Sequence, residues 1–181
     1  MNLSCWKSFN INKEFGSNRL YLMSLLLGIL SFILLYIPVS IYHQNHQLVD
    51  YGLIPLVITL FLLPMLHKLM HIVPLVFVNK RVRIRWKIKY WGGPTFTYMP
   101  YQPLSKKTSI FTALGPTLLL TIPGLISSFV FPSFHAYIVL LTSVNIAFSL
   151  SDFICVRQFL IAPKQCIIEN GRDSYDILIR K

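Results

Sequence analysis

Charged residues are scarce in this chain of 181 residues: they account for 13% of it, about half of the fraction usual in globular proteins, whereas 54% of the residues are hydrophobic. Acidic residues are the rarest of them, with 6 Asp and Glu against 17 Lys and Arg. A soluble domain covers its core with polar and charged side chains, and this composition leaves too few for that purpose. The composition therefore excludes an ordinary soluble enzyme and favours a membrane protein.

Cysteine is also scarce, with 3 residues at positions 5, 155 and 166. None of them forms a C-x-x-C pair, so the sequence lacks both the spacing of a cysteine-based zinc site and a disulfide framework. We interpret all of them as residues without a chemical role. Cys155 carries one reservation, because a thiolate is a soft metal ligand and could substitute at a site one helical turn away.

Long apolar stretches are abundant, and four of them are long enough to cross a bilayer, which takes roughly 20 residues. These stretches cover residues 20–41, 53–78, 108–131 and 134–161. The sequence therefore predicts an all-α integral membrane protein with four transmembrane helices, folded as a single membrane domain over residues 1–181.

The basic residues predict how these helices are oriented. Lys and Arg are frequent before the first stretch and at residues 79–107 and 162–181, but they are absent from residues 42–52 and 132–133. By the positive-inside rule, both termini and the 79–107 loop are cytoplasmic in a multi-pass protein of the cell membrane. The net charge of +11 is then explained by topology and by contact with anionic lipid headgroups, and we expect no nucleic-acid partner.

Two segments outside the spans have the pattern of β-hairpins. Residues 80–89, KRVRIRWKIK, alternate basic and bulky side chains with the period of a half-buried strand, and TFTYM follows after a Gly-Gly-Pro break. The tail around Asn170-Gly171 has two short β-prone runs on either side of a favourable turn dipeptide. The sequence therefore predicts one or two small cytoplasmic β-hairpins.

Polar residues inside the spans identify a candidate site. The second stretch contains HKLMH, in which His67 and His71 project from one face of a helix about 40° apart. The zinc-protease signature H-E-x-x-H has the same spacing, with a glutamate as the general base, but here the second position is Lys68.

Asp152, in the fourth stretch, lies at a matching depth. At about 1.5 Å per residue, the histidines are roughly 10 to 17 Å from the cytoplasmic end of their helix and Asp152 is about 13 Å from the end of its own. Two imidazoles and a carboxylate form a ligand set for zinc with one coordination position left for water. Two alternatives stay open: core histidines that bond to carbonyls freed by Pro64, and an ion pair of Lys68 with Asp152.

Several motifs in order along the chain resemble the bacterial putative zincin membrane peptidases, which are distant relatives of the site-2 intramembrane metalloproteases. They are HKLMH, the basic strand-like loop, ALGPT in the third stretch, Asn145 with Asp152 in the fourth, and APKQCIIENGRD in the tail. The resemblance implies that His67, His71 and Asp152 are the zinc ligands and that Lys68 stands at the position of the general base.

The lysine determines the function that we predict. An ammonium group cannot take a proton from a metal-bound water, and its charge repels the ion, so zinc binding is expected to be weak or absent. We therefore predict a catalytically inactive membrane scaffold that binds another membrane helix or a small protein. The alternatives are an active zinc-dependent intramembrane metallopeptidase and a small proton-coupled transporter.

Overall fold

The structure is a computed structural model, and it describes residues 3–44, 52–89, 93–171 and 174–180. Its long helices are α2 (Ser17–Tyr42), α3 (Leu53–Phe77) and a continuous helix over Lys106–Val130. The third of these consists of α4 (Lys106–Pro116), a π-helical turn η1 (Thr117–Thr121) and α5 (Ile122–Val130). These three helices are long and apolar enough to cross a membrane, which agrees with the first three predicted spans.

The fourth predicted span is interrupted. A short 3₁₀ turn η2 (Pro132–Phe134) leads into α6 (His135–Phe148), and after Ser149 the chain continues as α7 (Leu150–Ile161). The Ser149 hydroxyl and its backbone N–H both donate to the carbonyl of Asn145, at 2.9 and 3.0 Å. A serine that bonds back to its own helix in this way commonly bends or ends the helix. The two parts are bent by 45° at Ser149, and together they are long and apolar enough to form the predicted fourth span.

The described chain forms two compact units, each of which is drawn from several parts of the sequence. The first, here called the sheet unit, contains Met1–Leu20, His71–Gly115 and Ser151–Lys181; the second, the helical unit, contains Tyr21–Met70 and Pro116–Leu150. Helix α3 is continuous and supplies residues to both units.

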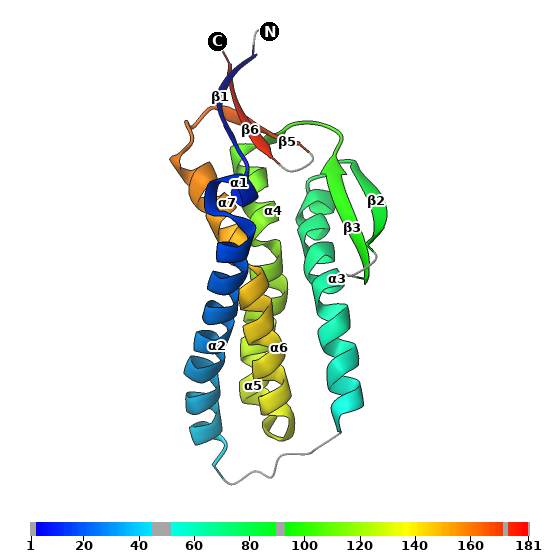
Figure 1. Ribbon diagram of the computed structural model, residues 1–181, viewed down its shortest axis with the longest axis vertical. Helices are drawn as coiled ribbons and strands as arrows, with labels where there is room; N and C mark the ends of the chain where they lie inside the picture. The colour runs from blue at the N-terminus through cyan, green and yellow to red at the C-terminus, as the bar shows by residue number, and fades with distance from the viewer. Residues whose placement is uncertain (1–2, 45–51, 90–92, 172–173, 181) are drawn as a thin grey trace. The chain divides into compact units, whose positions relative to one another are not determined.

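The sheet unit contains a four-stranded antiparallel sheet in the order β1-β6-β5-β4. Its strands are β1 (Leu3–Phe9), β4 (Leu104–Ser105), β5 (Cys166–Asn170) and β6 (Tyr175–Arg180), and a short helix α1 (Ile11–Phe15) follows β1 (Figure 1). The predicted tail hairpin is therefore confirmed as β5 and β6. The pairing of β1 with β6 was not predicted, because it joins the two ends of the sequence and has no local signal.

The predicted basic hairpin is also confirmed. Strands β2 (Val82–Lys89) and β3 (Gly93–Pro100) pair antiparallel, with Val82 opposite Pro100 and Ile84 opposite Tyr98. The core of the sheet unit includes Phe9, Phe159, Ile168 and Ile177, each of them at most 2% exposed. This core connects the sheet to α7, and α7 carries Asp152.

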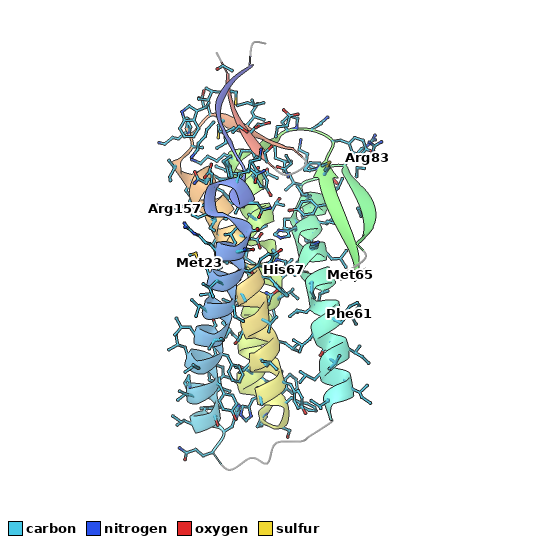
Figure 2. The ribbon with its side chains drawn as sticks, viewed as in Figure 1. Met23, Phe61, Met65, His67, Arg83 and Arg157 are labelled. Atoms are coloured by element: carbon cyan, nitrogen blue, oxygen red, sulfur yellow. The ribbon has the colours of Figure 1, made fainter. Side chains whose placement is uncertain are left out.

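The helical unit packs through small residues. A Cβ atom added at Gly124 in α5 would lie 2.4 Å from the Thr142 hydroxyl in α6, and one added at Gly28 in α2 would lie 3.1 Å from the Ala147 Cβ. Small residues allow apolar helices to approach closely. The outward side chains are apolar, as Figure 2 shows for Met23 and Phe61, which are 48% and 64% exposed.

Candidate metal centre

The two histidines of HKLMH lie one turn apart on α3, and both are buried, His67 at 7% and His71 at 5% exposure. Side chains four positions apart on a helix lie on the same face, so the unbroken helix directs both imidazoles to one side. Each histidine is held by a hydrogen bond to a different part of the chain.

In the sheet unit, His71 has a fixed tautomer. Its Nδ1 donates a hydrogen bond to the backbone carbonyl of Thr112, 2.8 Å away, because a carbonyl can only accept. The proton of a neutral imidazole then sits on Nδ1, and the lone pair is on Nε2. The ring of Tyr98 stacks on His71 with the ring centroids 5.5 Å apart. This combination of a hydrogen bond and a stacked ring orients Nε2 as a metal-ligating histidine requires.

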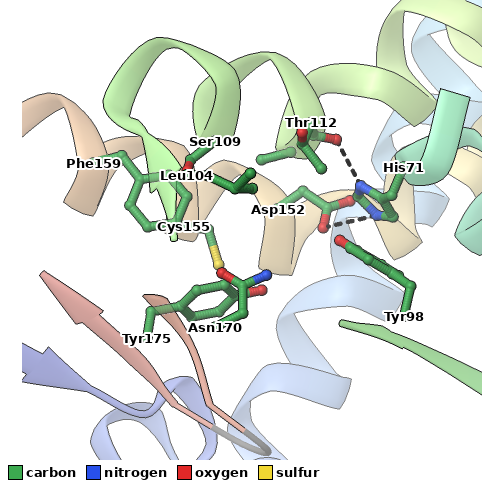
Figure 3. Close-up of a pocket in the computed structure, with 11 residues that line it drawn as sticks. His71, Tyr98, Leu104, Ser109, Thr112, Asp152, Cys155, Phe159, Asn170 and Tyr175 are labelled. Carbon is green, nitrogen blue, oxygen red and sulfur yellow. Dashed lines mark hydrogen bonds and ion pairs between the residues drawn. The ribbon is translucent and has the colours of Figure 1, made fainter. Parts of the chain in front are cut away.

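Asp152 lies opposite that nitrogen. Its Oδ1 is 3.4 Å from the His71 Nε2 (Figure 3). Two ligand atoms on a tetrahedral zinc ion with bonds of about 2.0–2.1 Å lie about 3.3 Å apart, and a good hydrogen bond is shorter. Two lone pairs at this distance repel each other unless a positive charge lies between them. A metal ion between the two atoms would supply that charge.

In the helical unit, a second network fixes the tautomer of His67. The Nδ1 of His67 donates to the side-chain oxygen of Asn145, 2.9 Å away. The Asn145 amide nitrogen donates to the Thr121 hydroxyl at 2.9 Å and approaches the Pro116 carbonyl at 3.4 Å. The Pro116 carbonyl can only accept and the Thr121 hydroxyl is able to accept, so the amide is oriented with its nitrogen towards them and its oxygen towards His67.

The π-helical turn over Thr117–Thr121 contributes to this second network. Thr121 is its last residue, and Pro116 directly precedes it. Single π turns inside α-helices often occur at functional sites. Here the Thr121 hydroxyl and the Pro116 carbonyl both accept from the amide nitrogen of Asn145. The amide oxygen then accepts the Nδ1 proton of His67, so the lone pair of that imidazole is on Nε2.

The structure therefore brings together two of the three predicted ligands, His71 and Asp152, in the sheet unit. His67 is one turn away on the same helix. Lys68 is partly buried on α3, and its pairing with Asp152 stays a prediction. Cys155 is buried one turn after Asp152 and lines the same small cavity as Asp152 and His71.

Some residues of the site were not predicted. Tyr98 lies in a run that reads only as a strand, the contribution of Thr112 is a backbone carbonyl, and Asn145 was noted without a role. The hydroxyl end of Tyr98 faces the cavity (Figure 3). Burial raises the pKa of this hydroxyl well above its ordinary value, and the nearby carboxylate of Asp152 and the thiol of Cys155 raise it further. Tyr98 is therefore a protonated hydrogen-bond donor at neutral pH.

The fold and the arrangement of these residues define a helical protein with apolar outer faces and a candidate metal centre built on α3 and α7. A family model described as a putative zincin peptidase matches residues 60–167, which is more than half of the chain. The chain belongs to this zincin peptidase family, which confirms the resemblance found in its motifs. The matched range contains His67, His71, Asn145 and Asp152. Comparison with curated proteins and with solved structures gives no match.

Proposed function

We propose that this protein is an integral membrane protein in which His67, His71 and Asp152 hold a zinc ion, with an affinity that the neighbouring positive charge of Lys68 weakens. The observation that carries the proposal is the 3.4 Å separation of the His71 Nε2 and the Asp152 carboxylate, which is the spacing of two zinc ligands. His67 joins them through helix geometry, since it follows the same face of α3 and its hydrogen bond to Asn145 leaves Nε2 to bind metal.

Location in a membrane is supported by the surface of the long helices. Large apolar side chains on α2 are strongly exposed, among them Leu22 at 58%, Leu26 at 57% and Leu34 at 62%. Contiguous apolar surface of this kind is unfavourable in water and suits contact with lipid. The distribution of Lys and Arg supports a cell-membrane topology with cytoplasmic termini.

The chain's own residues favour binding over cleavage. Zinc in this position would supply Lewis-acid chemistry, as in other zincins. The two histidines and Asp152 would bind and orient it, but Lys68 occupies the place of the general base. An ammonium group has no lone pair with which to accept a proton. We infer that the protein uses its intramembrane polar site to bind another membrane helix or a small membrane protein without cleaving it.

This function is tested with a tagged single-span model helix that is reconstituted with the full chain in vesicles containing zinc. Association is measured by energy transfer between labels, and cleavage is measured on gels. We expect specific association without cleavage, and weaker association for Asp152→Ala than for the control His135→Ala, which changes a buried residue of the helical unit. Cleavage that a zinc chelator abolishes would overturn the inactive scaffold.

An active zinc-dependent metallopeptidase is the second candidate. It is favoured by the cavity beside His71 and Asp152, which is large enough for the water that a hydrolytic reaction consumes. Zinc-dependent turnover in the assay above would select this candidate. Proton-coupled flux in the same vesicles would select the proton-coupled transporter.

A further inference from the structure

The cavity in the sheet unit is large enough for water and too small for a larger ligand. Its volume is about 20 Å³, and roughly 10–15 Å³ is sufficient for one water molecule. Residues from the end of α3, from β3, α4, α7, β5 and β6 line it (Figure 3). Asp152 and His71 are among them, so the cavity adjoins the proposed metal centre.

Two residues of α4 that carry hydroxyl groups line this cavity. Ser109 and Thr112 are each 4% exposed, and among the described residues neither side-chain oxygen has a hydrogen-bond partner. Both residues are among those that line the cavity. A buried hydroxyl that bonds to nothing destabilises a protein, so groups of this kind usually have a water molecule as partner.

Other hydroxyls of the chain show how an apolar helix normally satisfies such groups. Ser31, Thr142 and Ser143 each donate to the carbonyl of the residue four positions earlier, at 2.7 to 2.8 Å. Ser109 and Thr112 make no such bond. Their hydroxyls remain available to a ligand in the cavity.

We propose that this cavity is a water-binding site, in which the hydroxyls of Ser109 and Thr112 hold at least one water molecule beside Asp152. Water fits the lining, since it both donates and accepts hydrogen bonds and the hydroxyls of Tyr98 and Tyr175 and the amide of Asn170 surround the same space. The site brings water to the carboxylate of Asp152. It requires neither bound zinc nor peptidase activity.

The three cysteines of the chain provide a direct test by X-ray radiolysis, which makes hydroxyl radicals from water where it is bound. Cys155 lines the cavity and is 4% exposed, whereas Cys166 is equally buried at 4% and is not among the lining residues. Cys5 is exposed and serves as the positive control. We expect Cys155 in metal-free protein to be oxidised several times faster than Cys166, as measured by mass spectrometry. Equal rates for the two would overturn the proposal.

The double variant Ser109→Ala, Thr112→Val tests which groups hold the water. We expect the oxidation rate of Cys155 to fall towards that of Cys166. The thermal stability should be retained, because the substitutions remove two buried hydroxyls that make no hydrogen bond to the described residues. The control Thr142→Val removes a hydroxyl that bonds within its own helix and should leave Cys155 labelling unchanged. Unchanged labelling in the double variant together with a loss of stability would show that the hydroxyls are structural, and would contradict the proposal. Because the protein is metal-free throughout, a failed zinc site does not affect the result.

Discussion

Asn145 and the Thr112 carbonyl act on the proposed centre through the histidines that they hold. Each accepts the Nδ1 proton of one imidazole, at 2.9 Å for Asn145 and 2.8 Å for Thr112. A metal-ligating histidine commonly donates its other ring proton in this way, which fixes the tautomer and orients the ring. Asn145 is therefore a positioning residue, since its effect on metal binding passes through His67.

Replacing Asn145 tests this role. Loss of such a partner typically costs about 10- to 100-fold in metal affinity, so we expect Asn145→Leu to weaken zinc binding by that factor. Asn145→Asp keeps an acceptor for His67 and should lose much less. Competition with a zinc chelator on detergent-solubilised protein measures the affinity. Thr142→Val, on the same helix, is the control, and equal affinities for Asn145→Leu and the natural protein would refute the positioning role.

Lys68 is the residue that separates this chain from the complete H-E-x-x-H pattern. Lys68→Glu removes a positive charge next to the proposed ion and adds a negative one, so the Coulomb attraction increases. We expect the zinc affinity to rise at least about tenfold, which is about 1.4 kcal/mol. The same chelator competition measures it.

Lys68→Gln provides the matched control, because it removes the positive charge without adding a carboxylate. Its affinity should lie between those of the natural protein and Lys68→Glu. If all three bind zinc equally, Lys68 does not act on a metal site. The prediction concerns zinc affinity and does not require Lys68→Glu to recover peptidase activity. Cleavage also depends on access of water and on binding of a substrate, which this substitution does not change.

At the residue scale, the sequence predicted the candidate ligands but not the groups that hold them. His67 and His71 are visible from their spacing, and Asp152 is visible because a carboxylate in an apolar stretch is rare. Tyr98, Asn145 and the Thr112 carbonyl could not be predicted, because their roles depend on contacts between segments far apart in the chain. A backbone carbonyl has no signature in a sequence at all.

At the scale of the elements, the packing of α5 on α6 depends on a glycine. A Cβ at position 124 would lie 2.4 Å from the Thr142 Oγ1, which is too close for either atom to remain in place. Overpacking of this kind typically costs about 1–3 kcal/mol, so we expect Gly124→Ala to destabilise the protein by this amount. Unfolding by denaturing detergent in mixed micelles measures the change.

The partner residue provides the control for this prediction. Adding Thr142→Ala removes the clashing atoms and should recover much of the stability, whereas Thr142→Val keeps an atom in that position and should not. Gly28→Ala, with its nearest contact at 3.1 Å, should cost less. A Gly124→Ala protein as stable as Gly28→Ala would be inconsistent with the close approach of the two helices.

The elements themselves were predictable where their signals are local. Hydrophobic length predicted α2 and α3, and the alternation in KRVRIRWKIK predicted β2. The bend at Ser149 was not predicted, because a single serine in an apolar stretch does not indicate that its hydroxyl will donate to the carbonyl of Asn145. Strand β1 was missed because its pairing with β6 joins the two ends of the sequence.

At the scale of the whole molecule, the distribution of basic residues predicts the orientation in the membrane. Single cysteines at positions 46 and 85, introduced as His46→Cys and Arg85→Cys after removal of the native ones, should react differently with an impermeant reagent. Position 46 should be labelled from outside intact cells and position 85 only after the cells are opened. The reverse pattern would overturn the topology.

The measurement that tests the central claim most directly is the zinc content of the purified full-length protein in mild detergent, after equilibration with buffered zinc. The account predicts about one zinc ion per chain, as a site of two histidines and one carboxylate would hold. Zinc should be lost in His71→Ala and Asp152→Ala and retained in His135→Ala, which changes another buried histidine. Metal-free natural protein, or equal zinc in His71→Ala, would contradict the account, and His67 and His71 would then be core histidines in a zincin architecture.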